Sequence, residues 1–217
     1  MNILHYVTLI CATGILGACS STPPVAAPAA VANADGTYSL TQNGVTRDIL
    51  APVGTSGGTS LQYWNDLGGN EVGYMYESAD VIAIAVMDTT SNETFAGIAG
   101  TAASSVPTGG SGTYNGDFSA VYFRNGVTNA PWLARGAFTT TINFGSTVVT
   151  GSGTGNFSSD LAISGTVSGT EISGNATFSA TDYSGAATVP MNGGLYTNGT
   201  VAGVYQGTAV TGVFWGQ

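Results

Sequence analysis

Apolar and polar residues alternate with a period of two over much of the second half of the chain. Residues 172–180 (ISGNATFSA) place apolar residues or glycine at every second position, with Ser, Asn and Thr between them. Residues 161–168 and 138–144 follow the same alternation. Successive side chains of a strand point to opposite faces, so the pattern predicts strands buried on one face. A sustained apolar period of 3.6 residues does not occur beyond residue 34, so few helices are expected.

Segments of this kind recur at roughly the 8 to 12-residue spacing of β-sandwiches and β-barrels. Glycine lies on the apolar faces as well as in turns, where it permits sharp bends and favours a small closed barrel. We therefore predict an all-β protein whose residues 93–217 form an eight-stranded antiparallel up-and-down barrel, since about eight strands close around an interior filled by side chains. The predicted strands are 95–102, 112–123, 134–144, 146–152, 159–167, 170–180, 192–206 and 208–216.

Residues 35–92 have a different character, with the densest acidic set and several aromatic residues. The run 81–87 (VIAIAVM) is apolar at every position, which predicts a central strand packed on both faces. We interpret residues 35–92 as a smaller β-rich subdomain leaning on the barrel, with its boundary between Asp88 and Glu93.

The N-terminal segment resembles an export signal. Residues 7–16 (VTLICATGIL) have the length of a signal-peptide core and are too short to span a bilayer. Their last residue begins the sequence Leu16-Gly17-Ala18-Cys19, where a bacterial lipoprotein signal would be cut and acylated at the cysteine. We predict a signal peptide over 1–18, lipid attachment at Cys19, a disordered Ser, Pro and Ala-rich tether over 19–34, and anchoring at the outer membrane on the cell surface. The alternative is that Cys19 is an ordinary buried cysteine.

Removal of the signal peptide would also remove His5 and Cys11. The remaining chain would hold no histidine and no lysine, and its net charge would stay at −9. A chain without a basic stripe cannot neutralise phosphates, so nucleic acid is not an expected partner. Ser-His and Cys-His nucleophiles and Schiff-base lysines are excluded, so we expect no enzyme. Paired carboxylates among Glu71, Glu77 and Asp80 are the remaining catalytic alternative, and surface solvation explains them better.

No cofactor and no metal are expected, because histidine is the commonest ligand of such centres. Tyrosine and methionine can ligate haem iron, although core packing is their ordinary role. The residues that leave this alternative open are Tyr63, Tyr74, Met75, Tyr76, Met87 and Met191. A hard cation held by Asp66, Asn70 and Glu71 is a further alternative, but the segment lacks EF-hand spacing.

Several motifs occur in a characteristic order. Residues 95–101 (FAGIAGT) and 106–116 (VPTGGSGTYNG) form a strand, a Pro-Thr-Gly turn and a Gly-x-Tyr-x-Gly motif. Downstream come paired strands around a Phe-Gly turn (138–153), a hairpin (163–165 with 172–174) and a closing Gly-x-Tyr-x-Gly-x-Ala motif (203–214). In this order they resemble the barrel of transferrin-binding-protein-B-like surface lipoproteins.

The resemblance covers residues 93–217 and implies one lobe, with a handle subdomain of short strands before the barrel and a lipid holding it on the outer surface. Family members capture host iron proteins, haem carriers, free haem or complement regulators. The resemblance therefore implies a monomer that binds a protein or small ligand non-covalently, with an outer-membrane transporter as a further partner. The chain has the length of one lobe, and the connections between its barrel strands are short. The resemblance therefore supports the fold and the surface location more than it supports transferrin as the ligand.

By the same resemblance, ligand contacts come from the handle and from loops at the handle-facing end of the barrel. Two stretches carry aromatic residues beside polar ones, as interface hot spots do: 63–66 (YWND) and 124–132 (RNGVTNAPW). The candidate ligand-binding residues are Tyr63, Trp64, Tyr74, Tyr76, Arg124 and Trp132. Alternatively, Trp64 and Trp132 plug the handle-to-barrel junction or a barrel mouth.

Two other functions stay open: a structural envelope lipoprotein without a nutrient ligand, and an integral outer-membrane β-barrel. An integral barrel needs an outward apolar band with aromatic girdles. The Ser, Thr and Asn faces of several strands fit an exterior in water instead. The last strand is an exception, because Val213 and Trp215 on its second face are apolar as well.

Carbonate extraction separates the anchored protein from the integral barrel. Once the lipid anchor is removed, we expect carbonate to release the chain, because only acyl chains would hold it to the membrane. A chain that stays in the carbonate-washed pellet, measured by immunoblotting, would instead be an integral barrel.

Overall fold

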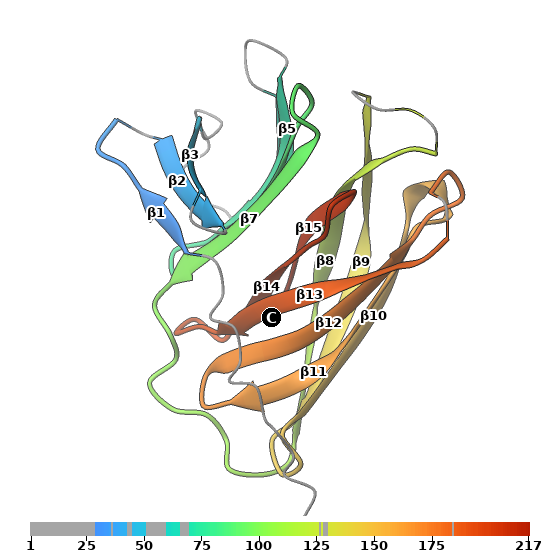
Figure 1. Cartoon of the computed structure of the whole chain (residues 1–217). Helices are drawn as coiled ribbons and strands as arrows, with labels where there is room; N and C mark the ends of the chain where they lie inside the picture. The colour runs from blue at the N-terminus through green and yellow to red at the C-terminus, as the bar shows by residue number, and fades with distance from the viewer. Residues whose placement is uncertain are drawn as a thin grey trace, which may run out of the picture.

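The computed structural model shows a protein built almost entirely from β-strands, arranged as a closed barrel and two smaller sheets (Figure 1). The residues it describes are 29–35, 37–42, 45–50, 60–65, 70–125, 127, 130–183 and 185–217. The predicted signal peptide, Cys19 and most of the predicted tether lie outside these residues.

The barrel contains the last eight strands of the chain. They are β8 (Ser111–Phe123), β9 (Pro131–Asn143), β10 (Val148–Gly155), β11 (Asp160–Ser168), β12 (Glu171–Ser179), β13 (Ala187–Leu195), β14 (Val201–Gln206) and β15 (Val210–Gly216). Each strand pairs antiparallel with its neighbour in sequence, and β15 pairs antiparallel with β8 to close the barrel. The predicted all-β class and eight-stranded antiparallel up-and-down barrel are confirmed.

Two of the predicted barrel strands are placed differently. Residues 93–100 form β7 (Glu93–Gly100), which pairs with the strand before it in a separate four-stranded sheet, so the barrel begins at β8 and not at residue 93. Residues 192–206 were expected as one strand but belong to β13 and β14, joined by a turn in which Gly199 has φ 79°. The dipeptide Asn198-Gly199 is a strong hairpin signal. The prediction of one continuous strand missed it because residues around it are apolar.

Large side chains fill the barrel interior. The ring centroids of Phe118 and Phe138 lie 6.1 Å apart, and those of Phe138 and Phe214 lie 5.5 Å apart. The hydroxyl of Tyr205 donates a hydrogen bond of 2.8 Å to the carbonyl of Ser119. Among the fully buried interior residues are Phe118, Tyr122, Phe138, Phe178, Tyr205 and Phe214. The interior is therefore a packed core, as expected for a barrel of this size.

A four-stranded sheet lies against the outer wall of the barrel over β8, β14 and β15. Its strands are β4 (Ser60–Asn65), β5 (Glu71–Glu77), β6 (Val81–Asp88) and β7. On β6, Ala83, Ala85 and Met87 pack with barrel residues, while Ile84 and Val86 pack with the three-stranded sheet. Residues 81–87 are thus confirmed as a central strand packed on both faces.

The same contact explains the apolar second face of the last strand. Val213 is fully buried and Trp215 packs beside it, in the apolar layer between the barrel wall and the four-stranded sheet. The Trp215 ring stacks on Tyr76 with centroids 4.7 Å apart. These side chains face the four-stranded sheet. This contact explains why both faces of the last strand are apolar.

The three-stranded sheet covers the other face of β6 and consists of β1 (Ala30–Ala32), β2 (Thr37–Gln42) and β3 (Val45–Leu50). We call the two small sheets together the handle. Strand β1 lies in the segment expected as tether, so that expectation is wrong for residues 30–32. Ala30 is only 4% exposed and packs with Leu40 and Ile49, because a small side chain fits closely between larger ones.

The rest of the barrel wall faces outward with polar side chains. On β9 to β12 the outward positions are mainly Thr, Ser and Asn, and most of them are exposed. In the part of the chain that the structure describes, none of the helical segments has the length or hydropathy to cross a membrane.

Arg47 on β3 links the two sheets of the handle. Its guanidinium forms ion pairs with Asp88 at the end of β6 and, at 2.9 Å, with Glu93 at the start of β7. The Asp88 carboxylate also accepts the backbone N–H groups of Thr90 (2.7 Å) and Ser91 (3.0 Å). Burial raises the pKa of Asp88, but these hydrogen bonds and the Arg47 charge outweigh it, and its pKa is lowered overall.

We expect this cluster to make stability depend on pH. Because the pKa of Asp88 is lower in the folded than in the unfolded chain, its contribution is fully present above the unfolded value of about 4 and is lost as pH falls through the folded value. Urea unfolding between pH 7 and pH 3 should show a decline that Asp88→Asn reduces. Asp160→Asn, at an exposed position on β11, should leave the decline unchanged. Equal slopes for Asp88→Asn and the wild type would contradict the assignment.

We expect Phe214→Ala to destabilise the barrel strongly. Phe214 is fully buried and contacts Phe138, so truncation leaves a cavity and should lower the free energy of unfolding by about 3–5 kcal/mol. Val148→Ala, at an exposed residue on the barrel wall, should change it by less than about 0.5 kcal/mol. Chemical denaturation measures both values, and a loss below about 1 kcal/mol for Phe214→Ala would contradict a packed interior.

Candidate functional site

One end of the barrel lies beside the end of the handle and carries four strand connections. They follow β8, β10, β12 and β14, and Figure 1 shows them at the upper end of the molecule, near the β6–β7 turn. The hydroxyl of Thr94 on β7 donates to the carbonyl of Gly207 at 2.5 Å, and the side-chain amide of Gln206 donates to the Thr94 carbonyl. These bonds hold the handle and this barrel end together.

Trp132 stands at the mouth of this barrel end. It packs against the barrel core from the inward face of β9 and remains partly exposed. The Phe157 ring meets it at a centroid distance of 5.2 Å in an edge-to-face arrangement. The guanidinium carbon of Arg124 lies 4.7 Å from the centre of the Trp132 ring, within cation–π range. Arg124 and Trp132, both predicted as ligand-binding residues, are therefore in direct contact.

A third connection completes the cluster. A side-chain oxygen of Asp182 lies 3.6 Å from the Arg124 guanidinium, and the carbonyl of Asp182 accepts the backbone N–H of Asn125 at 2.9 Å. The Tyr183 ring packs edge-to-face on Tyr122 at 5.8 Å, just inside the mouth. We call Arg124, Trp132, Phe157, Asp182 and Tyr183 the mouth cluster.

Phe157 is the least expected member of the mouth cluster. It lies in a short 3₁₀ turn, η1 (Asn156–Ser158), with φ 56° and ψ 31°, and its side chain is 48% exposed. A left-handed backbone costs a residue with a side chain about 1–2 kcal/mol, and such strain concentrates at functional sites. Hydrogen bonds around Asn156 maintain the turn. In one of them, the backbone N–H of Arg135 donates to the side-chain oxygen of Asn156 at 2.8 Å. The segment 156–159 (NFSS) only indicates a turn, so its sequence contains no signal for this exposed ring.

The cluster combines apolar surface with phenols that stay protonated. Phe157 is the exposed apolar part of the cluster, and Val127 in the β8–β9 connection is also 40% exposed. Burial raises the pKa of Tyr183, and it raises that of Tyr122 with a further contribution from the Asp182 charge. Among the described residues, the Tyr122 hydroxyl is fully buried without a hydrogen-bond partner. The accessible chemistry of this mouth is aromatic and cationic contact.

The other candidate residues lie elsewhere. Tyr74 and Tyr76 are 5% and 0% exposed, between the handle sheet and the barrel wall, where they pack and cannot reach a ligand. Tyr63 and Trp64 lie on β4, opposite Tyr74 and Gly73, and their side chains are outside the described part of the structure. The structure thus brings together the predicted pair at the mouth and separates it from the handle tyrosines.

The positions of the methionines and the glutamates argue against a haem site and against a catalytic pair of carboxylates. Met75, Met87 and Met191 lie in three different apolar clusters and so cannot share one haem. Glu71 and Glu77 occupy opposite ends of β5, roughly 20 Å apart along an extended strand, so they do not form a catalytic pair. Over the described ranges, no three His, Cys, Asp or Glu side chains group closely enough to hold a metal ion.

Comparison with known proteins identifies the fold. Neither a protein-family model nor a curated protein matches the sequence. Solved structures do match: a transferrin-binding protein B mutant from Haemophilus parasuis Hp5 superposes with a TM-score of 0.54 at 16% identity, over 82% of this chain and 40% of that one. The protein from serogroup B Neisseria meningitidis gives 0.53 and 15%, over 82% and 38%. A surface lipoprotein gives 0.53 and 13%, over 88% and 96%.

The chain therefore has a transferrin-binding-protein-B-like fold, with small handle sheets beside an eight-stranded barrel, which confirms the resemblance seen in the sequence. It spans about two fifths of the length of the transferrin-binding proteins that it matches and nearly all of the surface lipoprotein. This coverage corresponds to a single lobe. At these identities the similarity establishes the fold alone.

Proposed function

We propose that this chain is a surface lipoprotein that captures another protein non-covalently through the mouth cluster. The observation that carries the proposal is Phe157, an exposed aromatic ring held in a costly backbone conformation beside Trp132 and Arg124. Aromatic residues and arginine dominate the binding energy of protein interfaces, especially where several lie together.

The packed barrel favours a protein over a small solute. Because the interior is filled by rings such as Phe178 and Phe214, a ligand contacts the rim and the outside of the barrel. The loops at the mouth are short, so the contact surface is compact and includes the adjoining end of the handle. The net charge of −9 favours encounter with a neutral or basic partner surface.

Anchoring follows from the N-terminal motif and the fold together. Acylation at Cys19 after removal of residues 1–18 would hold the domain at the outer membrane, and the similarity to a surface lipoprotein supports this location. The two transferrin-binding proteins named above also have partners that are proteins, which supports a protein partner here. We further propose a monomer without catalytic activity, working beside an outer-membrane transporter.

A structural envelope lipoprotein without a nutrient ligand is the second candidate. The observation in its favour is that Trp132 packs against the barrel core and is only partly exposed, as a plug of the mouth would be. Phe157 distinguishes the two candidates, since a plug of the mouth would bury its ring, and this ring is 48% exposed.

We expect Phe157→Gly to weaken capture while leaving the fold intact. Glycine adopts the left-handed conformation without strain, which offsets the lost contact with Trp132, so the free energy of unfolding should change by no more than about 1 kcal/mol. Loss of a hot-spot ring should weaken binding by about 2 kcal/mol or more, roughly 30-fold. Trp132→Ala should weaken capture as well.

The measurement is native mass spectrometry of the domain from Ser20 onward, mixed with serum and with lysate of its own source. Val148→Gly, at another exposed apolar residue, serves as the matched control and should retain any bound partner. A bare monomer in every mixture would favour the structural role, whereas a partner retained by Phe157→Gly would contradict the assignment of capture to the mouth cluster.

A further inference from the structure

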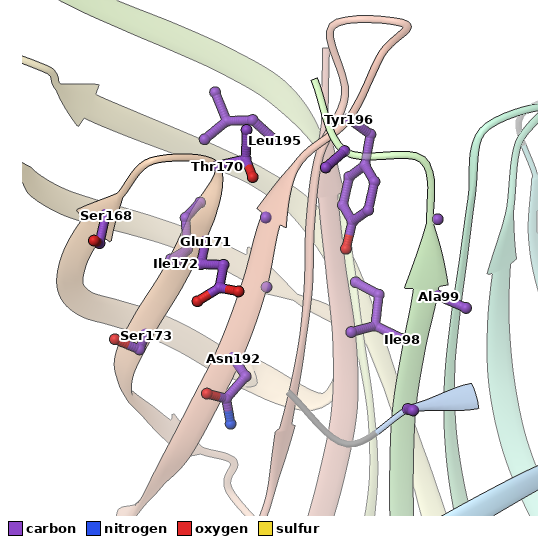
Figure 2. Close-up of a pocket in the computed structure, with 15 residues that line it drawn as sticks. Ile98, Ala99, Ser168, Thr170, Glu171, Ile172, Ser173, Asn192, Leu195 and Tyr196 are labelled. Carbon is purple, nitrogen blue, oxygen red and sulfur yellow. The ribbon is translucent and has the colours of Figure 1, made fainter. Parts of the chain in front are cut away.

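A separate groove lies where β7 of the handle approaches the barrel strands β12 and β13 (Figure 2). Its volume is about 440 Å³, within the range of about 300–1,000 Å³ usual for small-molecule sites. None of the mouth-cluster residues lines it. The groove is therefore a second concave surface with its own chemistry.

The barrel side of the groove carries several polar side chains and one charge, beside Leu195 and the glycines of β13. Glu171 and Ser173 come from the outward face of β12, and Asn192 comes from the adjacent outward face of β13. Thr170, in the turn before β12, completes this side. The Asn192 amide can donate and accept, the hydroxyls can do either, and the Glu171 carboxylate can accept two O–H groups.

The handle side is apolar and ends at a tyrosine. Figure 2 shows Ile98 across from Glu171 and Asn192, with Ala99 on the other face of β7 and Tyr196 closing the groove. Tyr196 is 8% exposed, and burial raises the pKa of its phenol, which therefore remains protonated. A Cβ on Gly100 would lie 2.6 Å from Cε1 of Tyr196, so only glycine permits this closure.

The backbone of Gly100 adds a donor and an acceptor. The N–H of Thr101 donates to the carbonyl of Asp80 at 2.8 Å, on the β6 side of β7, and Gly100 pairs with Val81. Neighbouring residues of an antiparallel strand direct their N–H and C=O groups to opposite edges, so those of Gly100 point to the outer edge of β7, where the groove lies.

We propose that this groove binds a short neutral saccharide. A sugar presents adjacent hydroxyls that match Asn192 and Glu171, and apolar C–H groups that match the Ile98 and Tyr196 side. The single carboxylate and the charge of −9 disfavour anionic ligands. The volume accommodates one or two sugar units.

An extended peptide does not fit the same edge. Ile98 is bridged to Ala29 and Ala102 is bridged to Tyr196, on either side of Gly100. A peptide that adds a strand needs several consecutive free backbone groups, and of the three residues between these bridges only Gly100 directs its N–H and C=O to this edge.

Saturation-transfer difference NMR on the full chain tests the proposal, with methyl glucoside, methyl galactoside, N-acetylglucosamine and maltose as probes. We expect saturation transfer to at least one of them, and an apparent Kd raised about 10-fold or more by Asn192→Ala and by Glu171→Gln, which corresponds to about 1.4 kcal/mol. Asn175→Ala is the matched control, because Asn175 is exposed on the same outward face of β12 but does not line the groove.

Three outcomes would overturn the proposal: no transfer to any of the four sugars, transfer that Asn192→Ala leaves unchanged, or binding only of spermidine that Glu171→Gln removes, which would make the groove a cation site. Unfolding curves for each variant check that the fold is retained. Phe157→Gly should leave sugar binding unchanged, so failure here is distinguishable from failure of protein capture at the mouth.

Discussion

The apolar contact between the handle sheet and the outer wall of the barrel holds the whole architecture together. An isolated barrel of this kind needs a polar exterior, yet Val213 and Trp215 make part of this wall apolar. Strands β5 to β7 of the four-stranded sheet cover that part of the wall, and Tyr76 stacks on Trp215. Apolar area removed from water on both sides stabilises the contact, so the handle and the barrel form one unit.

This contact determines where recognition can occur. It buries Tyr74 and Tyr76, so a ligand cannot reach them. It also aligns the end of the handle with the barrel mouth, where the hydrogen bond from Thr94 to Gly207 joins the handle to the barrel. Because the interior is filled, the two proposed sites lie at the rim and at the junction with the handle. The mouth cluster lies on the rim and the groove lies at the junction, and the two proposed sites share no residue.

Two of the arginine side chains have distinct structural positions. Arg47 neutralises Asp88 and Glu93 and so joins the two handle sheets, while Arg124 lies over Trp132 at the mouth. In a chain of net charge −9, Arg124 is one of only three Lys or Arg side chains in the sequence. Its partner Asp182 orients the guanidinium and leaves the planar face in contact with the ring, which is an arrangement that lysine cannot reproduce.

The sequence by itself determined the all-β class and the closed antiparallel barrel, because alternation of apolar and polar residues records which face of a strand is buried. It also determined the central position of residues 81–87, because an unbroken apolar run needs cover on both faces. It could not say against what each face is buried. For this reason β7 was expected in the barrel, while Tyr74 and Tyr76 were expected at a ligand. Tertiary structure alone decided that β7 joins the handle, that Phe157 meets Trp132 and Arg124, and that Glu171 and Asn192 face Ile98 across a groove. Each of these contacts joins residues from different strands or loops, and local periodicity carries no information about such distant partners.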